Sequence, residues 1–250
     1  MALISAGLGL SACQPAQKAA APQTPTASQQ SAAAPQPAPS TGGEQGEAGA
    51  VDAYAGITGA ERAGLRLQQL KGFLLAAQGL AKTGNEDAAR VLAQQGVLEA
   101  LEPALNEVGD LDLIAVRRAG TAGQGPLAPQ LTAALAAIEA AQKPLPAPGA
   151  DRVRRMLALS RGLYAQVNSP QGVDPIEYQH SWGAALAAAQ ALDAAKPALQ
   201  AKDGPRYDTA RAEMARLVAL WPGPVAPEKP APLSDIAAAA ARVELALSPF

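Results

Sequence analysis

Glu177 and His180 have the residue types and spacing of a metal site. They lie three positions apart, so a helix would place both side chains on one face. Helical carboxylate metal sites use this Glu-x-x-His spacing, because two such side chains can reach one ion. A complete site needs further ligands, and the chain has one histidine and one cysteine. The pair predicts either a site for iron or another divalent metal, or a structural histidine beside a glutamate that caps its helix.

Tyr178 and Trp182 lie one helical turn apart around this pair. Small residues follow them, namely Gly183, Ala184, Ala187 and Ala191. Two interpretations stay open. Either the aromatic side chains belong to the core and the small residues allow close helix packing, or Tyr178 and Trp182 form a patch that meets a ligand or partner.

Arg152, Arg154 and Arg155 occupy the first turn of a predicted helix, where positive charges oppose the helix dipole. We expect solvated arginines that pair with Asp151 and other carboxylates. Contact with an acidic partner is the alternative.

No arrangement in the sequence predicts catalysis or nucleic-acid binding. Ser160 has neither the flanking glycines of a nucleophile elbow nor a nearby base, so we predict a packed serine. Acid–base catalysis needs placed histidines or paired carboxylates. A formal net charge of −2 and 3% aromatic residues argue against a nucleic-acid partner. We therefore predict that the protein is not an enzyme.

The single cysteine, Cys13, has chemistry of another kind. It follows the apolar stretch from Ala2 to Leu10 and the small residues Ser11 and Ala12. This stretch is much shorter than the roughly 20 residues that span a bilayer. The order Leu-Ser-Ala-Cys resembles the lipobox of bacterial lipoproteins, and the resemblance covers residues 1–13. It implies a signal peptide that is cut before Cys13 and a palmitate-type lipid on the sulfur; the alternative is an apolar amino terminus with an ordinary thiol.

The predicted signal lacks a basic segment, since no Lys or Arg precedes Cys13. We expect the true start codon to lie upstream. Lys or Arg codons in frame there would support this expectation, and a stop codon immediately upstream would contradict it.

The residue after Cys13 suggests the compartment. It is Gln14, whereas lipoproteins kept at the inner membrane of Gram-negative bacteria typically carry Asp there. Several acyl chains hold a protein firmly to a membrane. We therefore expect a lipid-anchored protein on the periplasm-facing outer membrane.

Residues 14–50 have the composition of a tether. They contain no Val, Ile, Leu, Met, Phe, Trp or Tyr, and are rich in Ala, Pro, Gln, Ser, Thr and Gly. Such a segment cannot bury enough apolar surface to offset its ordering entropy, so we predict disorder.

Residues 51–250 form the predicted helical domain, and every convincing segment in it has helical period. A capping box at Thr58 and Glu61 begins the first helix, which Gly84 ends. A second helix starts at Asn85, and Pro103 should kink or split it. Its predicted buried residues are Val91, Leu98, Leu101, Leu105 and Val108.

Four further helices follow a connection rich in glycine and a helix around Leu127 to Ile138. We expect caps at Asp151, at Asp174 before Pro175, and at Ser234, with one more helix after Pro205. The predicted fold is an all-α, up-and-down bundle of six to seven helices after the disordered tether.

Two internal similarities raise the question of a duplication. The segment 98–105 resembles 192–199, and 76–80 resembles 188–192. The two matches imply different offsets, and alanine-rich helices also match by chance.

Three short segments resemble helical periplasmic modules of bacterial iron uptake, including imelysin-like proteins. They are residues 177–183 (EYQHSWG), 221–224 (WPGP) and 241–247 (ARVELAL). The resemblance covers about a third of the chain and implies a helical, periplasmic domain. Imelysin-like proteins carry a His-x-x-Glu signature, whereas Gly183 stands three residues after His180.

These features predict a lipid-anchored periplasmic binding or accessory protein, with a link to metal-ion (iron) uptake. The alternative is a structural or assembly lipoprotein that docks a periplasmic protein or cell-wall partner and takes no small-molecule ligand.

Overall fold

A computed structural model of the chain describes residues 53–123 and 125–250. The signal, Cys13 and the tether, predicted for residues 1–50, lie outside the described residues. The predicted all-α class is confirmed, because the described part contains nine α-helices and one short hairpin. Two short helices, α4 (Leu113–Gly120) and α8 (Lys196–Lys202), were not predicted.

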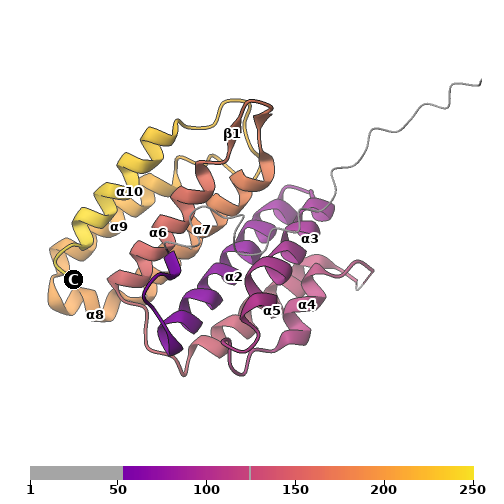
Figure 1. The fold of residues 1–250 in the computed structure, drawn as a ribbon, viewed down its shortest axis with the longest axis horizontal. Helices are drawn as coiled ribbons and strands as arrows, with labels where there is room; N and C mark the ends of the chain where they lie inside the picture. Colours follow the sequence, from indigo (N-terminus) through magenta and orange to yellow (C-terminus); the bar gives the residue numbers. More distant parts are fainter. Residues whose placement is uncertain (1–52, 124) are drawn as a thin grey trace, which may run out of the picture. The chain divides into compact units, whose positions relative to one another are not determined.

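The elements follow one another in chain order as Figure 1 shows. The first half contains α2 (Gly59–Lys82), α3 (Glu86–Gln95), the π-helical turn η1 (Gly96–Leu101), the 3-10 turn η2 (Glu102–Ala104), α4 (Leu113–Gly120) and α5 (Leu127–Gln142). The second half contains α6 (Ala150–Tyr164), the hairpin β1 (Asn168–Ser169) and β2 (Gly172–Val173), α7 (Pro175–Ala194), α8 (Lys196–Lys202), α9 (Gly204–Val218) and α10 (Leu233–Leu247).

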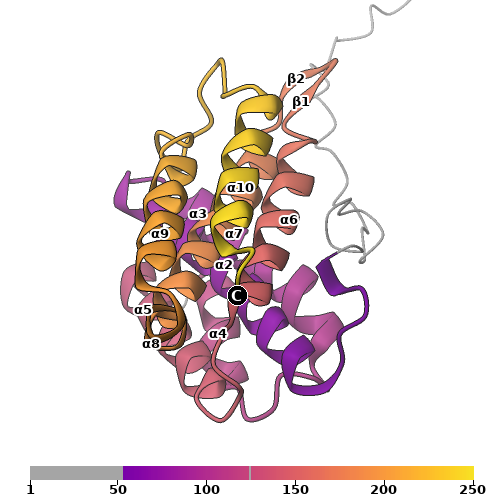
Figure 2. The ribbon, with the colours of Figure 1, turned by 90° about the vertical axis from the view of Figure 1, so that its left-hand side faces the viewer.

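The helices form two four-helix bundles. In the first, α2, α3, α4 and α5 pack in a closed ring, each against its neighbour in sequence, and α5 returns to α2. In the second, α6, α7, α9 and α10 make the same closed ring, seen from its outer side in Figure 2. Each bundle encloses its own core of leucine, alanine and aromatic side chains.

The four helices of each bundle pack in the same order along the chain. This repeat can be compared with the internal similarity in the sequence. The match of Leu98 with Leu192 implies an offset of 192 − 98 = 94 positions. This offset carries α2 onto α6, α3 onto α7, and α4 onto α9, and both matched segments contain a proline where a helix is interrupted. The second match, of 76–80 with 188–192, does not fit this correspondence.

Helix α2 joins the two bundles because it packs against α7 as well as against α3 and α5. Its side chains are buried all around, with Leu65 in the second core and Leu67 and Leu70 in the first. Polar groups on α2 therefore need partners inside the protein. Gln68 donates to the carbonyl of Ala187 on α7 at 2.6 Å.

Glycines on α2 allow this close approach. A Cβ at Gly72 would lie 2.9 Å from the Gly183 carbonyl oxygen, and a Cβ at Gly183 would lie 2.4 Å from that of Gly72. Gly64 and Gly79 lie on the same side of α2, and their missing Cβ atoms make room for Arg152 and Trp182. The backbones of α2 and α7 thus touch directly, and only glycine fits at the crossing.

Several predicted helix ends are confirmed. The Asp174 carboxylate accepts hydrogen bonds from the amides of Ile176 (2.8 Å) and Glu177 (3.2 Å), and Pro175 is the first residue of α7. Gly84, at φ +84°, ends α2 with its amide on the Ala81 carbonyl.

One predicted cap is confirmed in position only, and two are wrong. Thr58 is the N-cap residue of α2, but its side chain makes no cap hydrogen bond, and Gly59 after it has a left-handed backbone. The N-cap of α6 is Gly149, because Asp151 lies in the first turn and pairs with Arg155 instead. The N-cap of α10 is Pro232, and Ser234 lies inside the helix.

Pro103 interrupts its helix as predicted. It has no amide proton to donate, and the chain passes from α3 through the π-helical η1 into η2. The predicted burial of Val91 and Leu98 is wrong, since they are 54% and 58% exposed. The face of α3 that packs on α2 carries Ala89, Leu92 and Ala93, on the other side of the helix.

The α2–α7 contact predicts a large effect of one methyl group. We expect Gly72→Ala to lower the free energy of unfolding by about 1–3 kcal/mol, because neither backbone can move away without opening both cores. Gly204→Ala, whose Cβ meets only Gln200 Cγ at 3.8 Å, is the control and should be neutral or slightly stabilising. Urea unfolding measures both, and equal stability of the two variants would contradict the prediction.

Candidate functional site

His180 lies in the interface between the bundles. It is 6% exposed, its Nε2 is 3.3 Å from Oε1 of Gln95 on α3, and its ring meets Phe73 edge-on at 4.7 Å. Nδ1 has no hydrogen-bond partner within the described part of the chain. Burial lowers the pKa of His180 to about 4, although Asp174 opposes the shift. The imidazole is therefore neutral at pH 7.

The predicted metal pair gains no third ligand. Glu177 is half-buried one turn before His180. Across residues 53–123 and 125–250 no three His, Cys, Asp or Glu side chains come together at metal-binding distance. Metal binding by Glu177 and His180 stays a prediction from their spacing.

Tyr178 and Trp182 do not form an exposed patch. Tyr178 is fully buried, and its hydroxyl donates to the Gly223 carbonyl at 3.1 Å. Trp182 is half-buried against Gly79 and contributes to both cores. Tyr178 is therefore a core residue, as the packing interpretation predicts. Trp182 lies at the junction of the two bundles.

Ser160 is a packed serine, as predicted. It is 2% exposed and donates to the Ser181 carbonyl at 2.8 Å, which ties α6 to α7. The Ser181 hydroxyl in turn donates to the Tyr178 carbonyl and accepts from Nε1 of Trp221 at 3.2 Å. This buried chain of hydrogen bonds was not predicted, because its members are far apart in sequence.

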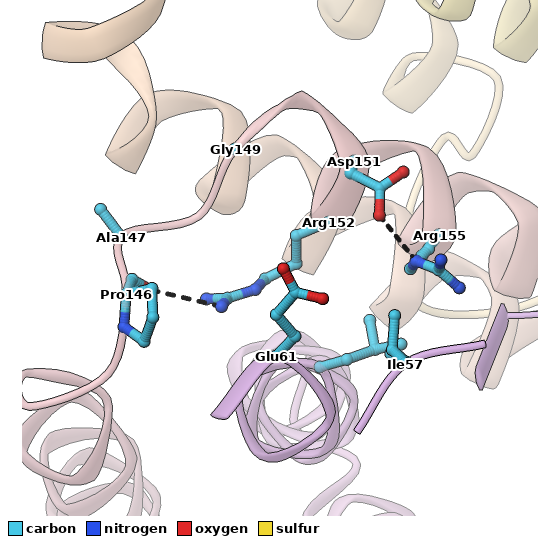
Figure 3. A pocket seen from close by; sticks show the side chains of 9 residues that line it. Ile57, Glu61, Pro146, Ala147, Gly149, Asp151, Arg152 and Arg155 are labelled. Atoms are coloured by element: carbon cyan, nitrogen blue, oxygen red, sulfur yellow. Dashed lines mark hydrogen bonds and ion pairs between the residues drawn. The ribbon is translucent and has the colours of Figure 1, made fainter. Parts of the chain in front are cut away.

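A small pocket opens where the start of α6 faces the start of α2 (Figure 3). Its volume is about 210 Å³. We call it the Arg152 pocket, and its walls are Ile57, Glu61, Leu65, Pro146, Ala147, Gly149, Asp151, Arg152 and Arg155. No feature of the sequence indicated that these segments meet.

Arg152 has unused hydrogen-bonding capacity in this pocket. Its guanidinium lies against α2 at Gly64, where a Cβ would come within 2.3 Å of Nη2, and it donates to the Pro146 carbonyl at 3.3 Å. Among the described residues no carboxylate lies within ion-pair distance of it. Burial lowers the pKa of Arg152 and nearby Glu61 opposes the shift, but an arginine side chain stays charged.

The neighbouring arginines are satisfied by the protein itself. Arg155 pairs with Asp151 at 2.8 Å and also donates to the carbonyls of Ala53 and Ala55, so the predicted Asp151 pairing is confirmed for this arginine. Arg154 donates to the Leu247 carbonyl at 2.6 Å. Arg152 is thus the member of the predicted cluster that lines the pocket without pairing with a carboxylate of the described residues.

The comparisons with known proteins give no relative. No protein-family model, no curated protein and no solved structure matches this chain. The resemblances to bacterial lipoproteins and to imelysin-like modules therefore stay predictions. None of the described helices is both long enough and apolar enough to cross a membrane.

The buried imidazole predicts a pH-dependent stability. Between pH 6.5 and about 4 the unfolded chain binds a proton at His180 that the folded protein does not, so stability falls as the pH falls. From pH 6.5 to 5 the loss should be about 1.5 kcal/mol. Urea unfolding at several pH values should show this slope in the wild type and its absence in His180→Gln. Equal slopes in the two proteins would show that His180 is not kept neutral by burial.

Proposed function

We propose that the protein is a lipid-anchored binding protein of the bacterial envelope, held at Cys13 and facing the periplasm. Its helical domain takes a small ligand with a carboxylate group in the Arg152 pocket. The observation that carries this proposal is the Arg152 guanidinium. It lines the pocket, and it forms no ion pair with any carboxylate of the described residues.

The chemistry of the pocket favours a carboxylate. A guanidinium offers parallel N–H groups that match the two oxygens of a carboxylate, and charge-assisted hydrogen bonds of this kind are strong. The first turn of α6 adds backbone amides that have no acceptor within the helix. A cavity of about 210 Å³ is smaller than the roughly 300–1,000 Å³ of sites for drug-sized molecules, so the ligand should be small.

The anchor is supported by the sequence. Leu10-Ser11-Ala12 before Cys13 has the lipobox order, and the tether composition of residues 14–50 suits a spacer between lipid and domain. Gln14, in the place where an Asp retains lipoproteins at the inner membrane, favours an outer-membrane location. The link to metal-ion uptake depends on the imelysin-like resemblance and on Glu177 and His180.

One surface favours the alternative function, the docking of a protein or cell-wall partner. A groove of about 560 Å³ lies between α3, η1 and α4, and the exposed Val91 and Leu98 line it. Ile114, on α4, is 72% exposed. Exposed apolar side chains that line one groove, as Val91 and Leu98 do, are typical of interaction surfaces. Loss of a partner from Leu98→Asp protein would support docking.

Lipidation can be tested directly. In cells that express the complete gene, the wild-type protein should incorporate radiolabelled palmitate and should be found in the membrane fraction. Cys13→Ser should take up no label and appear in the soluble fraction, because the chain has no other thiol to acylate. Unlabelled wild-type protein would remove the anchor from the proposal.

Ligand binding can be tested with propionate, a small carboxylate. We expect propionate to bind the wild type and Arg152→Gln to weaken binding at least about tenfold, since charge-assisted hydrogen bonds contribute about 1.5–3 kcal/mol. Arg206→Gln, an exposed arginine on α9, is the matched control and should bind like the wild type. Titration calorimetry measures propionate binding to the wild type and to both variants. If propionate gives no binding heat with the wild type, the proposed site is contradicted.

A further inference from the structure

We infer that the ligand of the Arg152 pocket is a small zwitterion, a molecule with a carboxylate and an ammonium group close together, as in a free amino acid. This inference rests on the proposed function and narrows it. It depends on a second unpaired charge in the same cavity, which belongs to Glu61.

Glu61 is placed to receive a positive group. It lies in the first turn of α2 and lines the pocket, and Figure 3 shows its carboxylate beside the side chain of Arg152, whose guanidinium points toward Pro146. The two groups are near enough for the Glu61 charge to act on Arg152, but they form no ion pair within 4.0 Å. Among the described residues Glu61 has no hydrogen-bond or ion-pair partner of its own.

The separation of these charges is the informative feature. Glu61 and Arg152 form no ion pair, because Arg152 is held against Gly64 and the Pro146 carbonyl. A molecule between them can accept from Arg152 with its carboxylate and donate to Glu61 with its ammonium group. Each end of the ligand would then meet an opposite charge, and charge-assisted hydrogen bonds of this kind are strong.

The remaining walls fit such a ligand. Arg155 and Asp151 neutralise each other at 2.8 Å, so the pocket as a whole carries no net charge. A ligand without net charge is the matching one. Ile57, Leu65 and Ala147 supply apolar surface for a short aliphatic side chain.

Alanine and its two half-molecules form the test. Propionate keeps the carboxylate and lacks the ammonium group, and ethylammonium keeps the ammonium group and lacks the carboxylate. Titration calorimetry on the purified full chain should give an alanine affinity at least about tenfold higher than that of propionate. Ethylammonium should give no measurable heat, because it lacks the group that Arg152 holds.

Two variants assign the two ends of the ligand. Glu61→Gln should weaken the binding of alanine about tenfold. Propionate should bind this variant as tightly as the wild type or more tightly, because a charge that repels its carboxylate is removed. Glu86→Gln, an exposed acidic residue in the first turn of α3, is the matched control and should change neither.

Gly149→Ser is a second test variant, chosen because it should weaken ligand binding without unfolding the protein. A Cβ at Gly149 meets no atom within 4 Å, and a serine at this N-cap can accept from the first-turn amides of α6. We expect a folded protein of at least wild-type stability that binds alanine at least about tenfold more weakly, because the new hydroxyl competes with the carboxylate.

The outcomes separate the two levels of the proposal. If alanine and propionate bind equally and Glu61→Gln changes neither, the zwitterion inference is overturned and the carboxylate site of the proposed function stands. If none of the three probes binds the wild type, water fills the pocket. The zwitterion inference and the proposed carboxylate site are then both overturned. Tighter binding of alanine that is lost in both Glu61→Gln and Gly149→Ser supports the inference.

Discussion

The contact between Gly72 on α2 and Gly183 on α7 holds the two bundles together. A Cβ on either residue would come within 3 Å of the carbonyl oxygen of the other, so the two helices approach as closely as backbones can. Four-helix bundles usually keep their helices apart by the width of their side chains. Here the absence of two side chains lets α2 belong to both bundles at once.

This constraint explains why so many polar groups of α2 are buried. Arg66, Gln68, Gln69 and Lys71 are all less than 9% exposed, and α2 is covered on every side. Gln68 and Lys71 find partners on α7 and α5, so polar bonds as well as leucines fix how α2 sits between its neighbours. The same closeness encloses His180 and brings the start of α6 over Gly64, where Arg152 borders its pocket.

Helical class, most helix positions, the Asp174 cap and the break at Pro103 could be predicted from the sequence, because each depends on residues close together in the chain. The exposure of Val91 and Leu98 could not, since a helix with apolar residues on two sides does not reveal which side faces the core. The roles of Gly72 and Gly79 could not be predicted either, because their partners Gly183 and Trp182 on α7 lie more than a hundred residues later. For the candidate site, the sequence singled out Arg152 only within a cluster of three arginines, and the segment that completes its pocket belongs to another helix.

A double-mutant cycle on Gly72→Ala and Gly183→Ala tests the direct backbone contact most closely. Each single methyl group must push α2 and α7 apart, and once they have separated the second methyl group enters a gap that already exists. The double variant should therefore lose clearly less unfolding free energy than the sum of the single losses, by about 0.5–3 kcal/mol. Strictly additive losses would show that the two glycines do not meet.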